Sequence, residues 1–407
     1  MTTKQTAEAS VASPRARHVA WAIVALALGG FVIGTTEFVT MGLLPEIARG
    51  IDSSIPKTGH VISAYALGVV VGAPAIISLS ARLPKRALAL GLVLALGLGN
   101  VLTALAPSYA ALFGARFIAG LPHGAYFGVA SLIAASLVPP ERRGRAVSSV
   151  MLGLAVANVV GVPASTWLGQ TLGWRSAYWT VVILTIVTAA AITVFVPHLP
   201  RDRAASVRRE LGALKRPQVW LTLGIGTVGF GGMFAVYSYI APTVTDVTGL
   251  SRSYIPWMLF AFGVGGVVGT VIGGKLADLA LFGSLVASMV TIGVILAVFM
   301  VAAHSPVGAF ATMFLLSVNA SVLVVCLQMR LMLVAGEAEM LGAALNHASL
   351  NIANGLGAWL GGIVIAAGYG YTAPAAVGVA LAGAGLVVLL VSALLERRQH
   401  LHTSLAH

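Results

Sequence analysis

Long apolar runs, each bounded by polar residues or by glycine and proline, recur along the whole 407-residue chain. A helix needs about 20 mostly apolar residues to cross a bilayer, and backbone groups in lipid must hydrogen-bond within their own segment. The pattern therefore predicts an all-α integral membrane protein with twelve transmembrane helices. The predicted spans are 19–45, 58–80, 87–106, 109–138, 144–172, 176–196, 218–246, 254–280, 282–303, 307–334, 340–368 and 372–395.

The most charged stretch of the chain, residues 197–217, divides the predicted spans into two halves. The expected organisation is a tail (1–18), a six-helix half (19–196), a central loop (197–217), a second six-helix half (218–395) and a tail (396–407). The halves are weakly similar, since the loop after the second span reads LSARLPKR at 79–86 and the eighth span ends GKLAD at 274–278. Two six-helix halves that share a binding site near the membrane midplane are a known plan of secondary transporters.

The composition supports a membrane location and sets the orientation. Hydrophobic residues make up 58% of the chain and charged residues 9%, whereas a soluble domain carries roughly 25% charged residues. The net charge of +12 comes from short basic clusters beside the apolar runs, which argues against a nucleic-acid partner. With the N-terminus in the cytoplasm, 19 of the 24 Lys and Arg face the cytoplasm and four face outward. The positive-inside rule then places both termini in the cytoplasm, and we expect a multi-pass, monomeric protein of the bacterial inner membrane.

Several functional classes lack their sequence signature. No GxxxxGK[ST] loop is present, so the energy for transport has to come from an ion gradient or from the substrate gradient. No HExxH motif and no G-x-S-x-G elbow with partner residues occurs, so we expect no enzyme activity. The single cysteine, Cys326, lies inside an apolar run, and no metal site and no cofactor are expected.

Two charged residues lie inside predicted spans, although an ionisable group in the membrane costs at least ~2.5–3.5 kcal/mol. Glu37 precedes the predicted outer end of the first span by eight residues, and Arg116 follows the predicted outer start of the fourth by seven. At about 1.5 Å per residue, both lie about 10–12 Å below the outer surface. Burial disfavours the charged carboxylate and a nearby cation favours it, so helix movement can drive proton uptake and release. A static ion pair that fixes helix packing is the alternative.

Other polar and aromatic positions are candidates for a relay or a cavity. His123 and Phe127 follow Arg116 and Gly120 on one helical stripe, and His123 can relay protons or be a structural, hydrogen-bonded histidine. Amides and a histidine share the eleventh span with small residues, where they line a cavity or hold helices together. The seventh span adds Met and aromatic side chains, for which core packing is the alternative. The candidate substrate-binding residues are Met41, Phe127, Met233, Phe234, Tyr237, Asn346, His347, Asn351 and Asn354.

The fifth span contains Gly153, Gly161 and Pro163. Proline removes a backbone hydrogen bond and bends a helix, while glycine permits a close approach of two helices. These residues are candidates for a hinge, with a static kink as the alternative.

Four stretches of the chain resemble a known family. They read GTTEFV at 34–39 followed by GLLP at 42–45, RFIAGLPHGA at 116–125, GVP at 161–163, and NIANGLGAWLGG at 351–362. Together they resemble the twelve-spanner drug:proton antiporters of the major facilitator superfamily, and within them the arabinose-efflux-like permeases. The resemblance covers essentially the whole membrane region and implies the major facilitator fold.

The resemblance also implies roles for single residues. Glu37 takes the place of the acidic residue that binds protons, Arg116 matches an arginine implicated in proton transfer, and Gly153, Gly161 and Pro163 fall in the antiporter motif of the fifth span. Arg82, Lys85 and Arg86 match the basic part of a gating loop. This loop departs from the family pattern at Ala81 and Pro84, and its aspartate survives only in the second half as Asp278. Thr166 and Trp167 replace a glycine pair in the fifth span.

The expected function is secondary active transport by alternating access, with proton-coupled efflux of a small molecule such as a drug, sugar or nucleoside. The expected partners are that substrate, protons and the lipid bilayer, and the proton gradient is the only energy source needed. Proton-coupled or facilitated uptake in the same fold is one alternative. A non-transporting membrane sensor is another.

Overall fold

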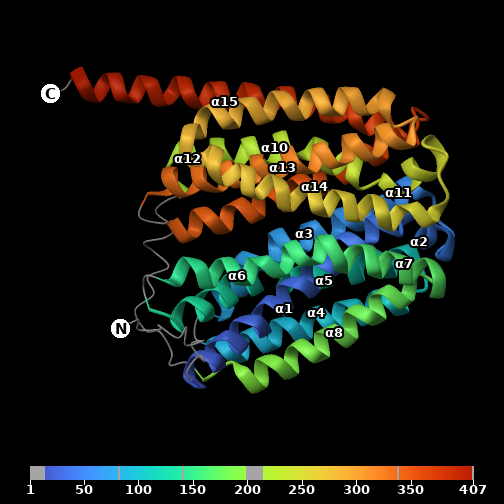
Figure 1. Ribbon diagram of the computed structural model, residues 1–407, viewed down its shortest axis with the longest axis horizontal. Coiled ribbons are helices and arrows are strands. Elements are labelled where there is room, and N and C mark those ends of the chain that lie inside the picture. The colour runs from blue at the N-terminus through green and yellow to red at the C-terminus, as the bar shows by residue number, and fades with distance from the viewer. Residues whose placement is uncertain (1–13, 81–82, 140–141, 199–213, 337–338, 406–407) are drawn as a thin grey trace, which may run out of the picture.

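The computed structural model describes residues 14–80, 83–139, 142–198, 214–336 and 339–405, and these residues form helices joined by short loops (Figure 1). Because no strand occurs in this described part, the predicted all-α fold class is confirmed. The first group of helices comprises α1 (Pro14–Gly42), α2 (Leu44–Gly50), α3 (Ile55–Ser80), α4 (Lys85–Leu105), α5 (Tyr109–Ser136), α6 (Arg143–Val156), the π-helical turn η2 (Ala157–Gly161), α7 (Val162–Leu172) and α8 (Trp174–Phe195).

The second group follows the central stretch of the chain. It comprises α10 (Pro217–Tyr237), α11 (Ile240–Pro242), the π-helical turn η4 (Thr243–Val247), the 3-10 turn η5 (Arg252–Tyr254), α12 (Ile255–Ala302), α13 (Pro306–Ala335), α14 (Glu339–Ala366) and α15 (Ala373–Leu405). In Figure 1 the two groups lie side by side, with α1–α8 in blue to green and α10–α15 in yellow to red.

The described helices match the twelve predicted spans. Ten helical stretches are long and apolar enough to cross a membrane. One of these stretches holds both limbs of the 48-residue α12, which is broken at Ala280, where φ is −159° and ψ is 73°. The 26-residue α3 is a further helix of spanning length. Local sequence sets the helix ends, because Ser108 and Ser305 cap α5 and α13 by accepting hydrogen bonds from Ala111 N and Gly308 N.

The two limbs of α12 separate at Ala280, where the predicted spans 254–280 and 282–303 meet. Two elements differ from the predicted spans. The fifth span is α-helical only outside η2, because Pro163 cannot donate a backbone hydrogen bond and the turn before it widens. α15 continues to Leu405, although the prediction ends this span at residue 395, since a helix that leaves the bilayer can continue with polar residues in water.

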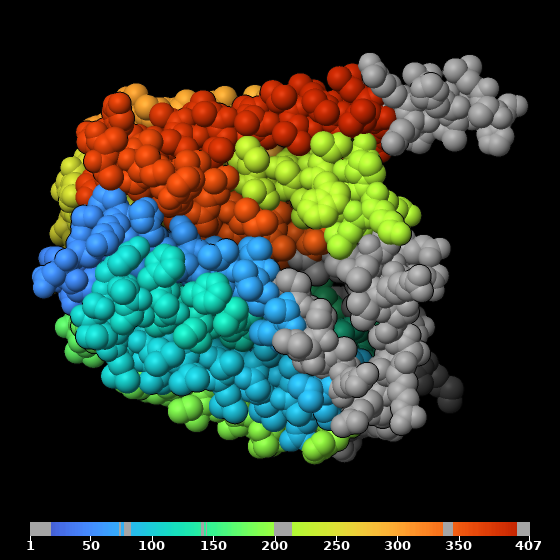
Figure 2. Space-filling view, turned by 180° about the vertical axis from the view of Figure 1, so that it is seen from behind, coloured from blue at the N-terminus to red at the C-terminus, as the bar shows by residue number. Residues whose placement is uncertain are grey.

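The two groups meet most closely at one end of the bundle. We call the end where α1 begins and α15 ends the terminal end, which lies at the left in Figure 1. Near the opposite end, Ser63 Oγ in α3 donates to Gly355 O in α14 at 2.8 Å, and Gln170 Nε2 donates to Arg252 O at 3.0 Å. Figure 2, seen from behind, shows the surface hollowed between the two groups toward the terminal end. The opposite end is therefore the closed end of this conformation.

Candidate functional site

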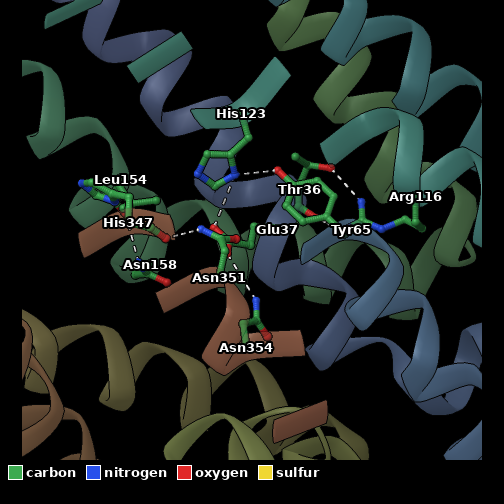
Figure 3. Close-up of polar contacts among 10 residues, drawn as sticks. All are labelled: Thr36, Glu37, Tyr65, Arg116, His123, Leu154, Asn158, His347, Asn351 and Asn354. Atoms are coloured by element: carbon green, nitrogen blue, oxygen red, sulfur yellow. Dashed lines mark hydrogen bonds and ion pairs between the residues drawn. The ribbon is translucent and has the colours of Figure 1, made fainter. Parts of the chain in front are cut away.

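Glu37 lies in α1 at the contact between the two groups, and only 5% of its surface is exposed. Asn354 in α14 donates a hydrogen bond from Nδ2 to Glu37 Oε1 at 3.3 Å. His123 Nδ1, on α5, lies 4.0 Å from Glu37 Oε2. Figure 3 shows His123 and Asn354 approaching this carboxyl from opposite sides. One carboxyl group thus contacts a residue from each half of the molecule.

Arg116 is fully buried and binds the residue beside Glu37. Its NH1 donates to Thr36 Oγ1 at 3.2 Å and its NH2 donates to the Thr36 carbonyl at 3.1 Å. The Thr36 hydroxyl in turn donates to Asn100 Oδ1 at 2.5 Å. No Lys or Arg forms an ion pair with Glu37 in the part of the chain that the structure describes. The expected influence of Arg116 on Glu37 is therefore exerted through Thr36 and across space.

Tyr65 in α3 connects the guanidinium group to the histidine. Its ring lies under Arg116 Cζ at 4.3 Å from the ring centroid, a cation–π geometry. Its hydroxyl lies 3.1 Å from His123 Nδ1. Arg116, Tyr65, His123 and Glu37 therefore form a continuous buried series of contacts (Figure 3).

The sequence prediction missed Tyr65 and Thr36, which supply the contacts between the charged residues. A tyrosine hydroxyl inside an apolar span needs a hydrogen-bond partner, and this requirement is the signal that could have identified Tyr65. Threonine gives a weaker signal, because its hydroxyl can bond a carbonyl one turn back in its own helix. Thr35 does so, with Oγ1 donating to Phe31 O at 2.8 Å.

The candidate site residues of α14 share the face toward the first group, except Asn346. His347 stacks on Phe127 of α5 with ring centroids 5.8 Å apart and an interplanar angle of 8°. Asn351 Nδ2 donates to His347 O at 3.0 Å, and Asn354 reaches Glu37. Asn346 is fully buried, and neither polar atom of its side chain has a partner among the described residues. One residue of helix turns it about 100° from His347, so it does not share that face.

The remaining candidate substrate-binding residues pack together between the groups. Phe38 of α1 stacks on Phe234 at 6.4 Å and meets Tyr237 edge-on at 6.0 Å. Met41 and Met233 belong to the same buried apolar cluster. The structure thus brings four of the candidates to one aromatic and thioether cluster that joins α1 to α10. In this conformation the cluster is closed, which is consistent with core packing and with an occluded binding region.

The glycines of the fifth span permit close helix packing. Gly153 lies against the backbone of Ala27 and Gly161 against the side chains of Thr35 and Phe31, so a larger residue would collide at either position. Pro163 follows η2 directly and is buried. These contacts join α1 to the fifth span and locate the helix irregularity at the predicted hinge.

The gating candidates are spread along the terminal end. Arg82 lies outside the described residues, and Lys85 is half-buried at the start of α4. Arg86 contacts His198 Nδ1 at 2.7 Å and donates to Thr193 O, so it ties the start of α4 to the end of α8 within the first group. Asp278 is exposed, two residues before the break in α12. These contacts lie within single groups and do not bridge the two.

The arrangement defines a class of protein: a helical membrane protein in which two six-helix groups meet around a buried carboxyl and close one end of the path between them. Comparison with known proteins gives the family. The family model described as Major Facilitator Superfamily matches residues 26–345. The chain therefore belongs to the major facilitator superfamily and is a multi-pass membrane transporter.

Relatives and a solved structure agree with this assignment. The inner membrane transport protein YdhP of Escherichia coli (strain K12) is 41% identical over 371 residues, which cover 91% of this chain and 95% of that protein. The chloramphenicol resistance protein of Streptomyces lividans is 35% identical over 257 residues, 62% of this chain and 66% of that protein. The fold resembles a bacterial homolog of the human lysosomal transporter Spinster, solved in an inward-facing, unoccupied conformation. That structure has a TM-score of 0.65, 18% identity and coverage of 94% of this chain and 96% of the other. YdhP, the more similar of these two relatives, is a transport protein.

Proposed function

We propose that this transporter exports a small molecule in exchange for protons, and that Glu37 binds the coupling proton. The observation that carries the proposal is the place of the Glu37 carboxyl, buried between the two groups without a Lys or Arg partner among the described residues. An unpaired buried carboxylate is costly, whereas a protonated carboxyl is neutral and can both donate and accept a hydrogen bond.

The contacts of Glu37 suggest how protonation couples to conformation. Asn354 reaches Glu37 from the second group, so this hydrogen bond exists only while the groups are closed at this depth. Loss of the proton leaves a charge that needs stronger compensation, from a protonated His123 or from a closer Arg116. Asn354 donates to this carboxyl, and a carboxylate accepts a hydrogen bond more strongly than a neutral carboxyl, so it is protonation that favours separation of Glu37 from Asn354. This separation would change the access to the region between the groups.

The direction of transport rests on two further points. The basic clusters place the terminal end in the cytoplasm, so a conformation closed at the opposite end faces inward, ready to load a substrate for export. The Streptomyces lividans relative is a chloramphenicol resistance protein, and drug resistance is what export of a drug would produce. Proton-coupled or facilitated uptake is the second candidate, because the same fold can run in either direction.

Inverted membrane vesicles test the proposal. With an acidic interior, addition of chloramphenicol or another substrate from a panel is expected to dissipate part of the pH gradient while the substrate accumulates inside. Glu37→Gln keeps the shape of the side chain and removes the titration, so the response is expected to disappear while the protein still inserts. Glu46→Gln, at the closed end, is the matched control and is expected to retain the response.

Undiminished proton-driven accumulation in Glu37→Gln would remove the coupling role from this residue. Substrate efflux from the vesicles down the gradient, with no proton movement in either variant, would favour facilitated diffusion instead.

A further inference from the structure

A second polar site lies on the lipid-facing surface of the second group, away from Glu37. The two limbs of α12 and one face of α13 enclose a groove of about 390 Å³. Its rim carries large apolar side chains that are exposed, among them Ile272, Leu276 and Leu315. Since an apolar rim on a transmembrane helix faces lipid, the groove opens toward the bilayer. None of its lining residues is charged.

The inner wall of this groove is polar. Ser288 is 4% exposed and Asn319 is 9% exposed, and both line the groove, as does the exposed Thr291. Asn319 Nδ2 donates to Ser288 O at 2.9 Å, which fixes the orientation of the amide and leaves Oδ1 as an acceptor. Among the described residues, no other hydrogen bond engages the Ser288 hydroxyl, the Thr291 hydroxyl or Asn319 Oδ1. Two hydroxyl groups and one amide oxygen in this groove can therefore form hydrogen bonds with a ligand.

The depth of these polar groups in the bilayer limits which molecules can form hydrogen bonds with them. Asn319 is close to the middle of the 30-residue α13, and Ser288 packs beside it. At about 1.5 Å per residue, both lie near the midplane of the hydrocarbon layer, about 20 Å from the start of α13. Phospholipid chains at that depth carry no polar atoms, and a buried polar group without a partner is costly. A lipid tail would fill the volume and leave the polar groups unsatisfied.

We propose that the groove binds a neutral, lipid-soluble small molecule that carries a carbonyl group next to an N–H or O–H group, as in an amide. The hydroxyls of Ser288 and Thr291 donate to the carbonyl, and Asn319 Oδ1 accepts the hydrogen of the ligand. The apolar rim holds the alkyl or ring portion. The absence of charge along the groove selects a neutral ligand, because an ion would enter this depth without a partner. The site shares no residue with the Glu37 contacts and does not depend on proton coupling.

Photolabelling in lipid vesicles tests this site. The probe is an N-alkyl alkanamide that carries a diazirine, and its control is a hydrocarbon of equal length with the same diazirine. The amide is expected to label α12 and α13 at the groove saturably, in competition with unlabelled amide. The double variant Ser288→Ala and Thr291→Val removes two donors at nearly constant shape and is expected to lower labelling about tenfold.

Two further variants separate binding from a general disturbance of the protein. Thr270→Val removes a lipid-facing hydroxyl outside the groove, one that bonds Gly266 O, and is expected to leave labelling unchanged. Ala287→Phe fills the groove from its exposed edge and is expected to abolish labelling.

Equal labelling by amide and hydrocarbon, unaffected by the double variant, would show that lipid chains fill the groove and would overturn the proposal. Cross-links from these positions to a second copy of the chain would also overturn it and identify the groove as a helix-packing interface.

Discussion

Two arginine–carboxylate regions of this molecule are built in opposite ways. At the terminal end, Arg330 of α13 donates from NH2 to Glu396 Oε2 of α15 at 2.8 Å and from NH1 to Oε1 at 3.4 Å. The Glu396 side chain is 37% exposed and both partners belong to the second group. Glu37 and Arg116 are both buried, do not pair directly, and are separated by Thr36.

The difference indicates which of the two carboxyl groups can change its protonation when the two groups of helices move. A direct, bidentate pair within one group has its charges compensated in every arrangement of the two groups, so it serves as a clamp for α15. A buried carboxyl without a direct cation, held instead by an amide from the other group, changes its surroundings whenever the groups move. We therefore propose proton exchange at Glu37 and a structural role for Glu396. The loss of proton-coupled transport in Glu37→Gln is the largest effect that this comparison predicts.

Arg116→Ala is expected to give the next largest effect. It removes two hydrogen bonds to Thr36 and the cation–π contact with Tyr65 from a fully buried region, so transport is expected to fall at least about 100-fold. Arg116→Lys retains the charge but not the planar fork, and the fall is expected to be about tenfold. Initial rates in vesicles, normalised to inserted protein, check both variants. Equal rates in the Ala and Lys variants would contradict a role for charge.

Tyr65→Phe sharpens the comparison, because it keeps the ring beneath Arg116 and removes only the hydroxyl that contacts His123. Loss of one hydrogen bond is expected to lower the coupled rate about threefold to tenfold and to change its pH profile. The measurement is the rate against pH for Tyr65→Phe beside Tyr126→Phe, whose hydroxyl donates to Leu26 O away from Glu37. A pH profile unchanged in the first variant would exclude His123 and Tyr65 from the relay.

Glu396→Gln is expected to leave the coupled transport rate and its pH dependence unchanged. Because Glu396 is more than a third exposed, loss of its pair with Arg330 is expected to cost less than about 1 kcal/mol of stability. Melting of the purified protein in detergent measures that cost, and the vesicle assay measures transport. A loss of coupling as large as that in Glu37→Gln would erase the contrast between the two regions.

Glu46 gives the smallest expected effect, on stability alone. This residue lies in α2, beyond the end of α1, and burial raises the pKa of Glu46 above its ordinary value, outweighing the opposing effects of its own backbone, Arg49 and Arg252. The folded protein therefore holds this proton more tightly than the unfolded chain, so this contribution is present at low pH and is lost as pH rises through the raised pKa. Glu46→Gln is expected to make the melting temperature fall less steeply as pH rises above the ordinary range of a carboxyl pKa. An unchanged slope would contradict this assignment.

The fold could be predicted from the sequence because each transmembrane span is recognisable by the length of its apolar run. The break at Ala280 falls where the prediction ends one span at residue 280 and begins the next at residue 282. The π-helical turn before Pro163 was partly foreseeable, since proline requires some irregularity, but its form depends on how Gly153 and Gly161 pack against α1.

The charged residues of the candidate site could be predicted from the sequence, but their contacts could not. Glu37 and Arg116 stand out because ionisable residues are rare in spans, and depth could be counted along each helix. The direction in which each side chain points depends on the rotation of its helix, which a residue count does not give. The guanidinium therefore turns to Thr36 and Tyr65, and Asn354, one of several amides on α14, is the one that reaches Glu37.

The central claim is that the Glu37 carboxyl gains and loses a proton under conditions in which the protein remains folded. Infrared difference spectroscopy during a pH titration in lipid tests it most directly. The wild type is expected to show the C=O stretching band of a protonated carboxyl that disappears as pH rises, and Glu37→Gln is expected to lack it while Glu396→Gln keeps it. The same titrating band at undiminished intensity in Glu37→Gln would contradict the claim.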